Sequence, residues 1–181
     1  MIAVLNSKKL EPDKLKERIE AFLAERKTCA LATAAGDFVR CTPIEYNYLD
    51  GAFYLFSEGG LKFKALQNNK NVSLAIFDSY DGFGNLKGLQ VQGTVSLIEP
   101  FSEEYIILLD HKKIPVEGMR KLPKAMNLIK VAPTSFDLLD SDLKQEGVDS
   151  RQHFDVSKKG RTSKTLDCEI HGKRVNENNN A

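Results

Sequence analysis

Residues 38–48 alternate in side-chain character, and this run constrains the fold more than any other segment. As a strand, one face would carry Phe38, Arg40 and Thr42, and the opposite face would carry Val39, Cys41 and Pro43. The turn signal Leu49-Asp50-Gly51 follows, and a second β-like run over 52–56 comes after it. Together these segments predict a β-hairpin. Pro43 has no amide hydrogen, so the first strand should lie at an edge or contain a bulge.

Further short runs follow the same hairpin spacing, while helical patterns occur only at the margins. We expect strands over 28–33, 71–77, 89–98 and 128–139, with Pro133 interrupting the last one. We expect helices over 12–25, 61–68, 105–109 and 119–126. A lone open sheet of this length would leave exposed edges, which closure removes. The pattern therefore predicts a mainly β fold, a small antiparallel barrel of about six strands with peripheral helices.

Length and charge narrow the class of protein. The chain has 181 residues, enough for one core, and we expect a single domain over 1–150 with a partly disordered basic tail over 151–181. A net charge of +1 gives no strong field that would attract nucleic acid or an anionic membrane. The three cysteines have unrelated spacings, and no apolar run approaches a membrane span or a signal peptide. We therefore expect a cytoplasmic protein.

Several short motifs suggest functions, but each has a simpler interpretation. The glycines from Gly82 to Gly88 resemble a dinucleotide loop, yet they are wrongly spaced and join two strands, which indicates a hairpin turn. Cys168 and His171 offer two metal ligands, whereas structural zinc needs four. The basic run over 158–164 contains no aromatic residue and is typical of a solvated tail. The chain has neither a P-loop nor a Gly-x-Ser-x-Gly elbow.

One group of residues has the composition of an anion site. Arg40 and Thr42 share a face of one strand, Ser57 ends the next strand, and Gly59-Gly60-Leu61-Lys62 leads into a helix. A guanidinium fork, a hydroxyl, an ammonium group and amides at a helix start are groups that bind phosphate. These residues taken alone are also compatible with an ordinary surface strand followed by a loop.

Three segments resemble the pyridoxamine phosphate oxidase-like flavoproteins, the FMN-binding split barrels. They are residues 37–48, residues 55–62, and above all the run Gln67-Asn68-Asn69-Lys70-Asn71-Val72-Ser73-Leu74. The order of elements matches over roughly residues 12–100. The resemblance implies a six-stranded antiparallel split β-barrel that binds FMN at the interface of a homodimer. Each flavin site would use both chains.

The resemblance also implies roles for individual residues. Arg40 and Lys62 would hold the phosphate, with Leu61 beside Lys62 in the same loop. Cys41, Thr42 and Pro43 would lie along the isoalloxazine through their backbone. Phe56 and Ser57 would line the ribityl chain and the phosphate.

The chain departs from the oxidase that gives the family its name. Glu45 stands where that enzyme has a lysine, so one phosphate cation is missing, and the chain contains no tryptophan. Arg151-Gln152-His153 is similar to the Arg-x-His of that enzyme's substrate site, but the surrounding sequence does not match, and we interpret the similarity as chance. We therefore do not expect a true pyridoxamine phosphate oxidase.

Three functional hypotheses follow, in order of preference. The first is an FMN-dependent oxidoreductase acting on a small-molecule redox substrate, with no catalytic acid or base identified. The second is a non-enzymatic carrier or sensor that holds flavin or haem on the same barrel. The third, an unrelated small barrel that binds single-stranded nucleic acid, is favoured only by the basic tail.

Overall fold

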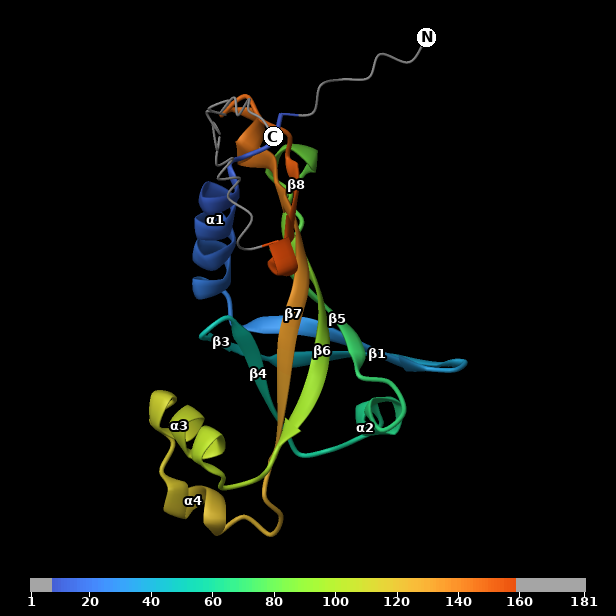
Figure 1. Ribbon diagram of the computed structural model, residues 1–181, viewed down its shortest axis with the longest axis vertical. Coiled ribbons are helices and arrows are strands. Elements are labelled where there is room, and N and C mark those ends of the chain that lie inside the picture. The colour runs from blue at the N-terminus through green and yellow to red at the C-terminus, as the bar shows by residue number, and fades with distance from the viewer. Residues whose placement is uncertain (1–7, 159–181) are drawn as a thin grey trace, which may run out of the picture.

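The computed structural model describes residues 8–158 and folds them into one curled antiparallel sheet with helices outside it (Figure 1). The strands are β1 (Thr28–Ala35), β2 (Phe38–Glu45), β3 (Asn47–Leu49), β4 (Ala52–Ser57), β5 (Asn71–Phe77), β6 (Lys87–Ile98), β7 (Asn127–Asp140) and β8 (Arg151–Asp155). Their order is β2-β1-β5-β6-β7-β4-β3, and β8 pairs with β7. The α-helices are α1 (Pro12–Ala24), α2 (Lys62–Leu66), α3 (Glu103–His111) and α4 (Val116–Arg120). Short 3-10 turns are η1 (Phe83–Asn85), η2 (Ser141–Lys144) and η3 (Val156–Lys158).

Tyr46 explains why the sheet has more strands than the sequence predicts. The expected single strand over 38–48 breaks at this residue into β2 and β3, which occupy opposite ends of the strand order. Tyr46 is buried, and its hydroxyl donates a 3.1 Å hydrogen bond to the carbonyl of Leu23 in α1. With β2 and β3 counted as one bent strand, the path has the six strands expected of the split barrel. The prediction of a mainly β antiparallel barrel is therefore confirmed, with β8 as an addition.

The strand β8 lies in the segment where the sequence predicts a tail. Arg151 pairs with Leu139 of β7, and Asp155 pairs with Ser135. Gln152 between them is 3% exposed, and its side-chain oxygen accepts a 3.1 Å hydrogen bond from the amide of Leu10. The sheet thus extends past residue 150. Cys168, His171 and most of the basic run over 158–164 lie outside the described residues.

Two apolar clusters share the strand β4, because its side chains alternate between them. Phe53 and Leu55 belong to the main core inside the sheet, together with the α1 stripe that the sequence predicts: Leu15, Ile19, Phe22 and Leu23. Tyr54 faces the other way, into a second cluster formed mainly by α3 and α4. This second cluster contains Ala52, Tyr54, Tyr105, Leu108, Leu109, Met119 and Leu128.

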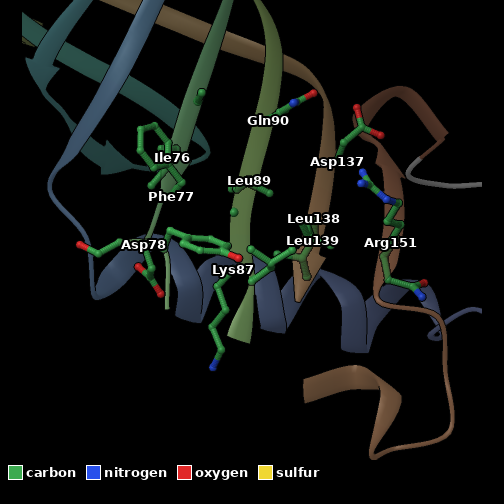
Figure 2. A pocket seen from close by; sticks show the side chains of 16 residues that line it. Ile76, Phe77, Asp78, Lys87, Leu89, Gln90, Asp137, Leu138, Leu139 and Arg151 are labelled. Carbon is green, nitrogen blue, oxygen red and sulfur yellow. The ribbon is translucent and has the colours of Figure 1, made fainter. Parts of the chain in front are cut away.

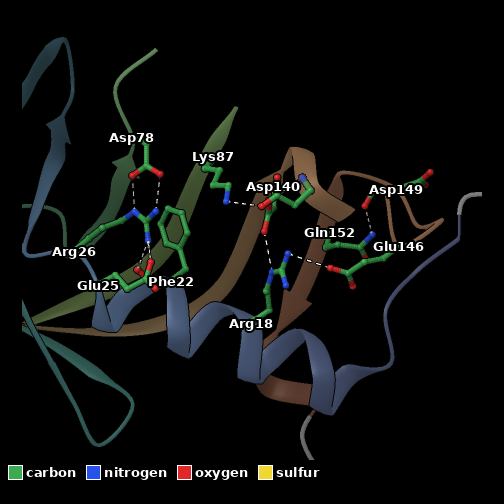
Figure 3. A network of polar contacts seen from close by, with 11 residues as sticks. Arg18, Phe22, Glu25, Arg26, Asp78, Lys87, Asp140, Glu146, Asp149 and Gln152 are labelled. Carbon is green, nitrogen blue, oxygen red and sulfur yellow. Dashed lines mark hydrogen bonds and ion pairs between the residues drawn. The ribbon is translucent and has the colours of Figure 1, made fainter. Parts of the chain in front are cut away.

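Ion pairs fix α1 against the strand ends (Figure 3). Arg26 binds Asp78 through two hydrogen bonds of 2.6 Å each, and its guanidinium lies 3.7 Å from the centre of the Phe22 ring. Nearer the start of α1, Arg18 donates a 2.9 Å hydrogen bond to the buried carboxylate of Asp140. Bidentate guanidinium–carboxylate geometry is the strongest form of such a pair. These contacts hold the helix across the ends of β5 and β7.

Prolines shape the long pair of strands and the helix before it. The ladder between β6 and β7 shifts register after Gln92, beside Pro133, so the predicted interruption is confirmed as a β-bulge. The helix expected over 119–126 forms instead over Val116–Arg120. Pro123 lies inside the expected range, and a proline cannot occupy a helix interior without removing a hydrogen bond. Among residues 8–158, no helix is long and apolar enough to cross a membrane.

Candidate functional site

The loop after β4 is organised around the carbonyl of Gly59. The Lys62 ammonium donates a 2.6 Å hydrogen bond to this oxygen, and the Ser57 hydroxyl lies 3.2 Å from both the oxygen and the amide nitrogen of Gly59. Ser57 and Lys62 are only 5% and 8% exposed. Gly59 and Gly60 have φ angles of +136° and +97°, which other residues rarely adopt. The sequence Ser-Glu-Gly-Gly-Leu-Lys thus folds into a tight turn that buries a lysine.

Arg40 supplies a second positive charge close to Lys62. Burial lowers the pKa of the Lys62 ammonium, and the charge of Arg40 lowers it further. Within the part of the chain that the structure describes, neither side chain forms an ion pair. Two neighbouring cations without a carboxylate repel each other, and an anion between them would remove that cost.

Two threonine hydroxyls on the same face also lack hydrogen-bond partners among the described residues. In the β1–β2 ladder Thr33 pairs with Arg40, and Thr42 lies two residues further along the same face of β2. The side-chain oxygens of Thr33 and Thr42 are buried, and they are the two buried side-chain polar atoms in residues 8–158 without a hydrogen-bond partner. A buried polar group normally has a partner, because leaving it unpaired is costly. Two buried hydroxyls on the Arg40 face of the β1–β2 pair thus have no hydrogen-bond partner within residues 8–158.

We call Thr33, Arg40, Thr42, Ser57 and Lys62 the anion cluster. Four of its members are among the residues expected from the sequence, and Thr33 was missed. Thr33 belongs to the cluster through its cross-strand pairing with Arg40, and a pairing register between two strands cannot be read from residue types alone. The helix α2 has only five residues, so the cluster depends on side chains rather than on the start of a helix.

The remaining expected residues lie around the cluster without adding side chains to it. Cys41 and Pro43 are exposed on the opposite face of β2, so only their backbone could run along a ligand at the cluster. Leu61 is 56% exposed. The ring of Phe56 packs edge-on against Tyr105 of α3, 5.4 Å between centroids, in the second apolar cluster.

Glu45, the residue at which the chain departs from the oxidase, does not disturb the cluster. It lies five residues beyond Arg40 on β2, roughly 16 Å along the strand, and on the opposite face. Its carboxylate accepts a 2.7 Å hydrogen bond from the ammonium of Lys112, the residue that follows α3. The negative charge of Glu45 is thus balanced away from the two cations.

On the outer face of the described sheet, uncharged side chains fill the area between Glu45 of β2 and Asp137 of β7. We call this area the neutral face. In the ladders of β2, β1, β5 and β6 it comprises Val39, Cys41, Pro43, Ala30, Ala32, Ala34, Ser73, Ala75, Phe77, Gln90 and Gln92. Val39 and Phe77 are 72% and 68% exposed. Exposed apolar side chains gathered on one face of a sheet can mark an interaction site.

A cavity of about 480 Å³ borders the neutral face (Figure 2). Its floor follows one row of paired residues, Phe77, Gly88, Leu139 and Arg151, across four strands. The Arg151 side chain forms no ion pair with the described residues. The neighbouring His153 is hydrogen-bonded to Asp137, 2.7 Å between Nδ1 and Oδ1. The size of the cavity is typical of small-molecule sites.

The family of the chain follows from a match to a family model. The profile described as pyridoxamine 5'-phosphate oxidase matches residues 15–137, which is more than half of the chain. The chain belongs to this family. The matched residues include the whole anion cluster and the strands β1 to β6. No curated protein sequence matches the chain.

Solved structures share the fold at low sequence identity. The heme storage protein HutZ from Vibrio cholerae is 20% identical, with a TM-score of 0.55, covering 66% of this chain and 89% of its own. An FAD-binding protein from Mesorhizobium loti is 19% identical, with a TM-score of 0.55, covering 67% and 89%. ChuZ from Campylobacter jejuni is 14% identical, with a TM-score of 0.62, covering 82% of this chain and 62% of its own. The family fold thus occurs in proteins with different ligands.

Proposed function

We propose that this protein binds FMN at the anion cluster and acts as a flavin-dependent oxidoreductase on a small molecule. The observation that carries the proposal is the pair Arg40 and Lys62, two cations without a carboxylate partner in the described residues. The phosphate of FMN would neutralise both. The FAD-binding neighbour from Mesorhizobium loti supports a flavin as the cofactor.

The residues of the cluster suit a phosphate in type and position. Arg40 can bind two phosphate oxygens through its fork, Lys62 adds a point charge, and Ser57 adds a hydroxyl. The partnerless hydroxyls of Thr33 and Thr42 offer two further hydrogen bonds on the Arg40 face. When bound, FMN would supply the hydride and electron chemistry, while the chain supplies binding and orientation.

We further propose that the protein is a homodimer whose neutral face meets a second copy. The face is uncharged and contains exposed apolar side chains such as Val39, which a partner would remove from water. The backbone of residues 41–43, which is expected along the flavin ring, lies under the same face.

We propose that the small-molecule redox substrate binds in the cavity beside Arg151, which borders the neutral face. The chain's cysteine pattern supports a cytoplasmic location.

A haem-binding carrier is the second candidate function. The observation that favours it is the fold likeness to HutZ, a heme storage protein, which is as close as the likeness to the FAD-binding protein. FMN and haem would present different charged groups to the anion cluster. FMN brings one phosphate group to a compact pair of cations, whereas haem brings two carboxylates and a much larger apolar ring.

Absorption spectra of the purified recombinant protein separate the candidates. FMN binding predicts a yellow protein whose cofactor, released by heat, runs as FMN in chromatography. A Soret band would support the haem carrier, and a colourless protein that binds neither cofactor when supplied would contradict both. Flavin reduction by a reduced nicotinamide then separates an enzyme from a carrier.

Sedimentation equilibrium tests the proposed homodimer. It should give twice the chain mass of 20.3 kDa, and a monomer with tightly bound flavin would contradict the shared site.

A further inference from the structure

The helix α2, which carries Lys62, is too short to hold its own position. It has five residues, and an isolated helix of that length is not stable in water. Its placement therefore depends on contacts with other elements. Ala65 and Leu66 are buried in the protein, and the ammonium of Lys64 lies 5.0 Å from the centre of the Phe38 ring on β2.

Asn69 supplies the most specific of these contacts. Its side-chain amide donates a 2.9 Å hydrogen bond to the carbonyl of Ala34, which lies 35 residues earlier in the chain. Its side-chain oxygen accepts a 3.0 Å hydrogen bond from the amide of Asn71, where β5 begins. Its own amide donates a 2.9 Å hydrogen bond to the carbonyl of Ala65 in α2. One residue therefore ties together the end of α2, the start of β5 and the end of β1.

The tie to β1 bears directly on the anion cluster. Ala34 follows Thr33, and Thr33 pairs with Arg40 in the β1–β2 ladder. Lys62 belongs to α2, whereas Arg40 and Thr33 belong to the hairpin of β1 and β2. The Asn69–Ala34 hydrogen bond is a long-range contact that links these two units. Together with the contact of Lys64 on Phe38, this hydrogen bond fixes α2, and with it Lys62, relative to the β1–β2 hairpin.

We infer that Asn69 is a positioning residue for the anion cluster, setting the distance between Lys62 and Arg40 through its hydrogen bond to Ala34. The inference rests on the proposed function where it concerns FMN. The structural part, that Asn69 controls the surroundings of Lys62, stands on the described contacts alone. It also gives a physical role to an asparagine of the run over 67–74, which sequence comparison singles out without explaining.

The experiment compares Asn69→Ala with Asn68→Ala, a matched control in the same turn. The side chain of Asn68 donates a 3.3 Å hydrogen bond to the carbonyl of Lys64 in α2, and among the described residues it forms no hydrogen bond with β1. FMN and riboflavin are titrated into flavin-free protein by flavin fluorescence. Asn69→Ala should weaken FMN binding about fivefold, as expected for loss of one neutral hydrogen bond, and leave riboflavin binding unchanged. Asn68→Ala should change neither.

A second measurement needs no flavin. The lysines are reductively methylated with ¹³C, and the Lys62 resonance is titrated by NMR. In Asn69→Ala the pKa of Lys62 should move back towards its ordinary value, because α2 loosens and both burial and the proximity of Arg40 decrease. If the alanine variant does not fold, Asn69→Ser replaces it in both measurements. The serine hydroxyl can still accept a hydrogen bond from the amide of Asn71, but the side chain is too short to reach the carbonyl of Ala34.

The outcomes separate the inference from the proposed function. If the Lys62 pKa moves in the Asn69 variant but no form of the protein binds FMN, the positioning role stands and the FMN proposal falls. If FMN binds to the wild type and the Asn69 variants retain both the wild-type affinity and the wild-type Lys62 pKa, the positioning role is wrong. Equal weakening of FMN and riboflavin, with an unchanged Lys62 pKa, would likewise overturn it, since that pattern reports general destabilisation.

Discussion

The ammonium of Lys62 donates a 2.6 Å hydrogen bond to the carbonyl of Gly59, three residues before it. The lysine is 8% exposed, and its neighbouring charge is the positive one of Arg40. A buried cation whose partner is a neutral carbonyl is costly unless an anion offsets it. This arrangement is the physical basis for the proposed phosphate site, and it leads to predictions on pH, on the threonine hydroxyls and on the two cations.

The lowered pKa of Lys62 predicts a pH dependence of FMN binding. The protonated ammonium binds phosphate, and its charge is lost as the pH rises through a pKa below the ordinary 10.5. The ratio of FMN to riboflavin affinity should therefore fall on the alkaline side before an ordinary lysine would titrate. In Lys62→Arg the ratio should stay flat over the same range, because arginine keeps its charge. Fluorescence titrations of both ligands from pH 7 to pH 10 check this, and identical profiles in the two proteins would contradict it.

Thr33→Val should stabilise the flavin-free protein while weakening FMN binding. The hydroxyl of Thr33 is buried without a partner, so an apolar side chain of the same shape removes a desolvation cost of about 1–3 kcal/mol. The same change removes a hydrogen bond that the ligand would otherwise receive. Thermal melts of the variant test the predicted gain in stability, and FMN titrations test the predicted loss of affinity. A variant less stable than the wild type, with unchanged FMN affinity, would show that Thr33 has no ligand-binding role.

Gly93 of β6 lies where the backbone of β7 approaches closely at the bulge, so a side chain at this position should destabilise the fold. A Cβ added to Gly93 would lie 2.7 Å from a methyl group of Val131 and 2.8 Å from the carbonyl oxygen of Ala132. Backbone cannot move aside easily, so Gly93→Ala should destabilise the fold by about 1–3 kcal/mol. Gly84→Ala is the control, because nothing lies within 4 Å of its added Cβ. Urea denaturation of both variants checks the difference, and equal midpoints would contradict the close approach.

Much of the fold could be predicted because it depends on local patterns. The stripe of α1, the hairpin spacing and the edge position of Pro43 follow from periodicity and from proline chemistry, and the structure has all three. The break at Tyr46 could not be predicted, since a buried tyrosine that bonds to Leu23 looks in sequence like any other strand residue. The pairing of β8 with β7 was missed for a similar reason. Its five residues carry no strong alternation, and their stability comes from β7.

In the candidate site, too, residues with a recognisable local pattern could be predicted, whereas those that matter through long-range contacts could not. Arg40, Ser57 and Lys62 were recognisable because their chemistry is unusual for a strand end and a loop. Thr33 was not, because it joins the cluster through its pairing across the β1–β2 ladder, and the contact of Asn69 with Ala34, across 35 residues of chain, could not be read from the run over 67–74. The role of Phe56 beside the ribityl chain stays a prediction, and its ring contact with Tyr105 of α3 could not be read from the sequence, because α3 follows far along the chain.

The most direct test of the account is the FMN affinity of Arg40→Ala and Lys62→Ala, measured against riboflavin in the same preparations. Hydrogen bonds to charged groups are worth about 1.5–3 kcal/mol, so either change should weaken FMN binding roughly tenfold to a hundredfold. Riboflavin has no phosphate, and its affinity should be unchanged in both variants. Arg40→Lys should recover only part of the FMN affinity, because it keeps the charge and loses the fork. Wild-type FMN affinity in both alanine variants would contradict the phosphate site and, with it, the proposed function.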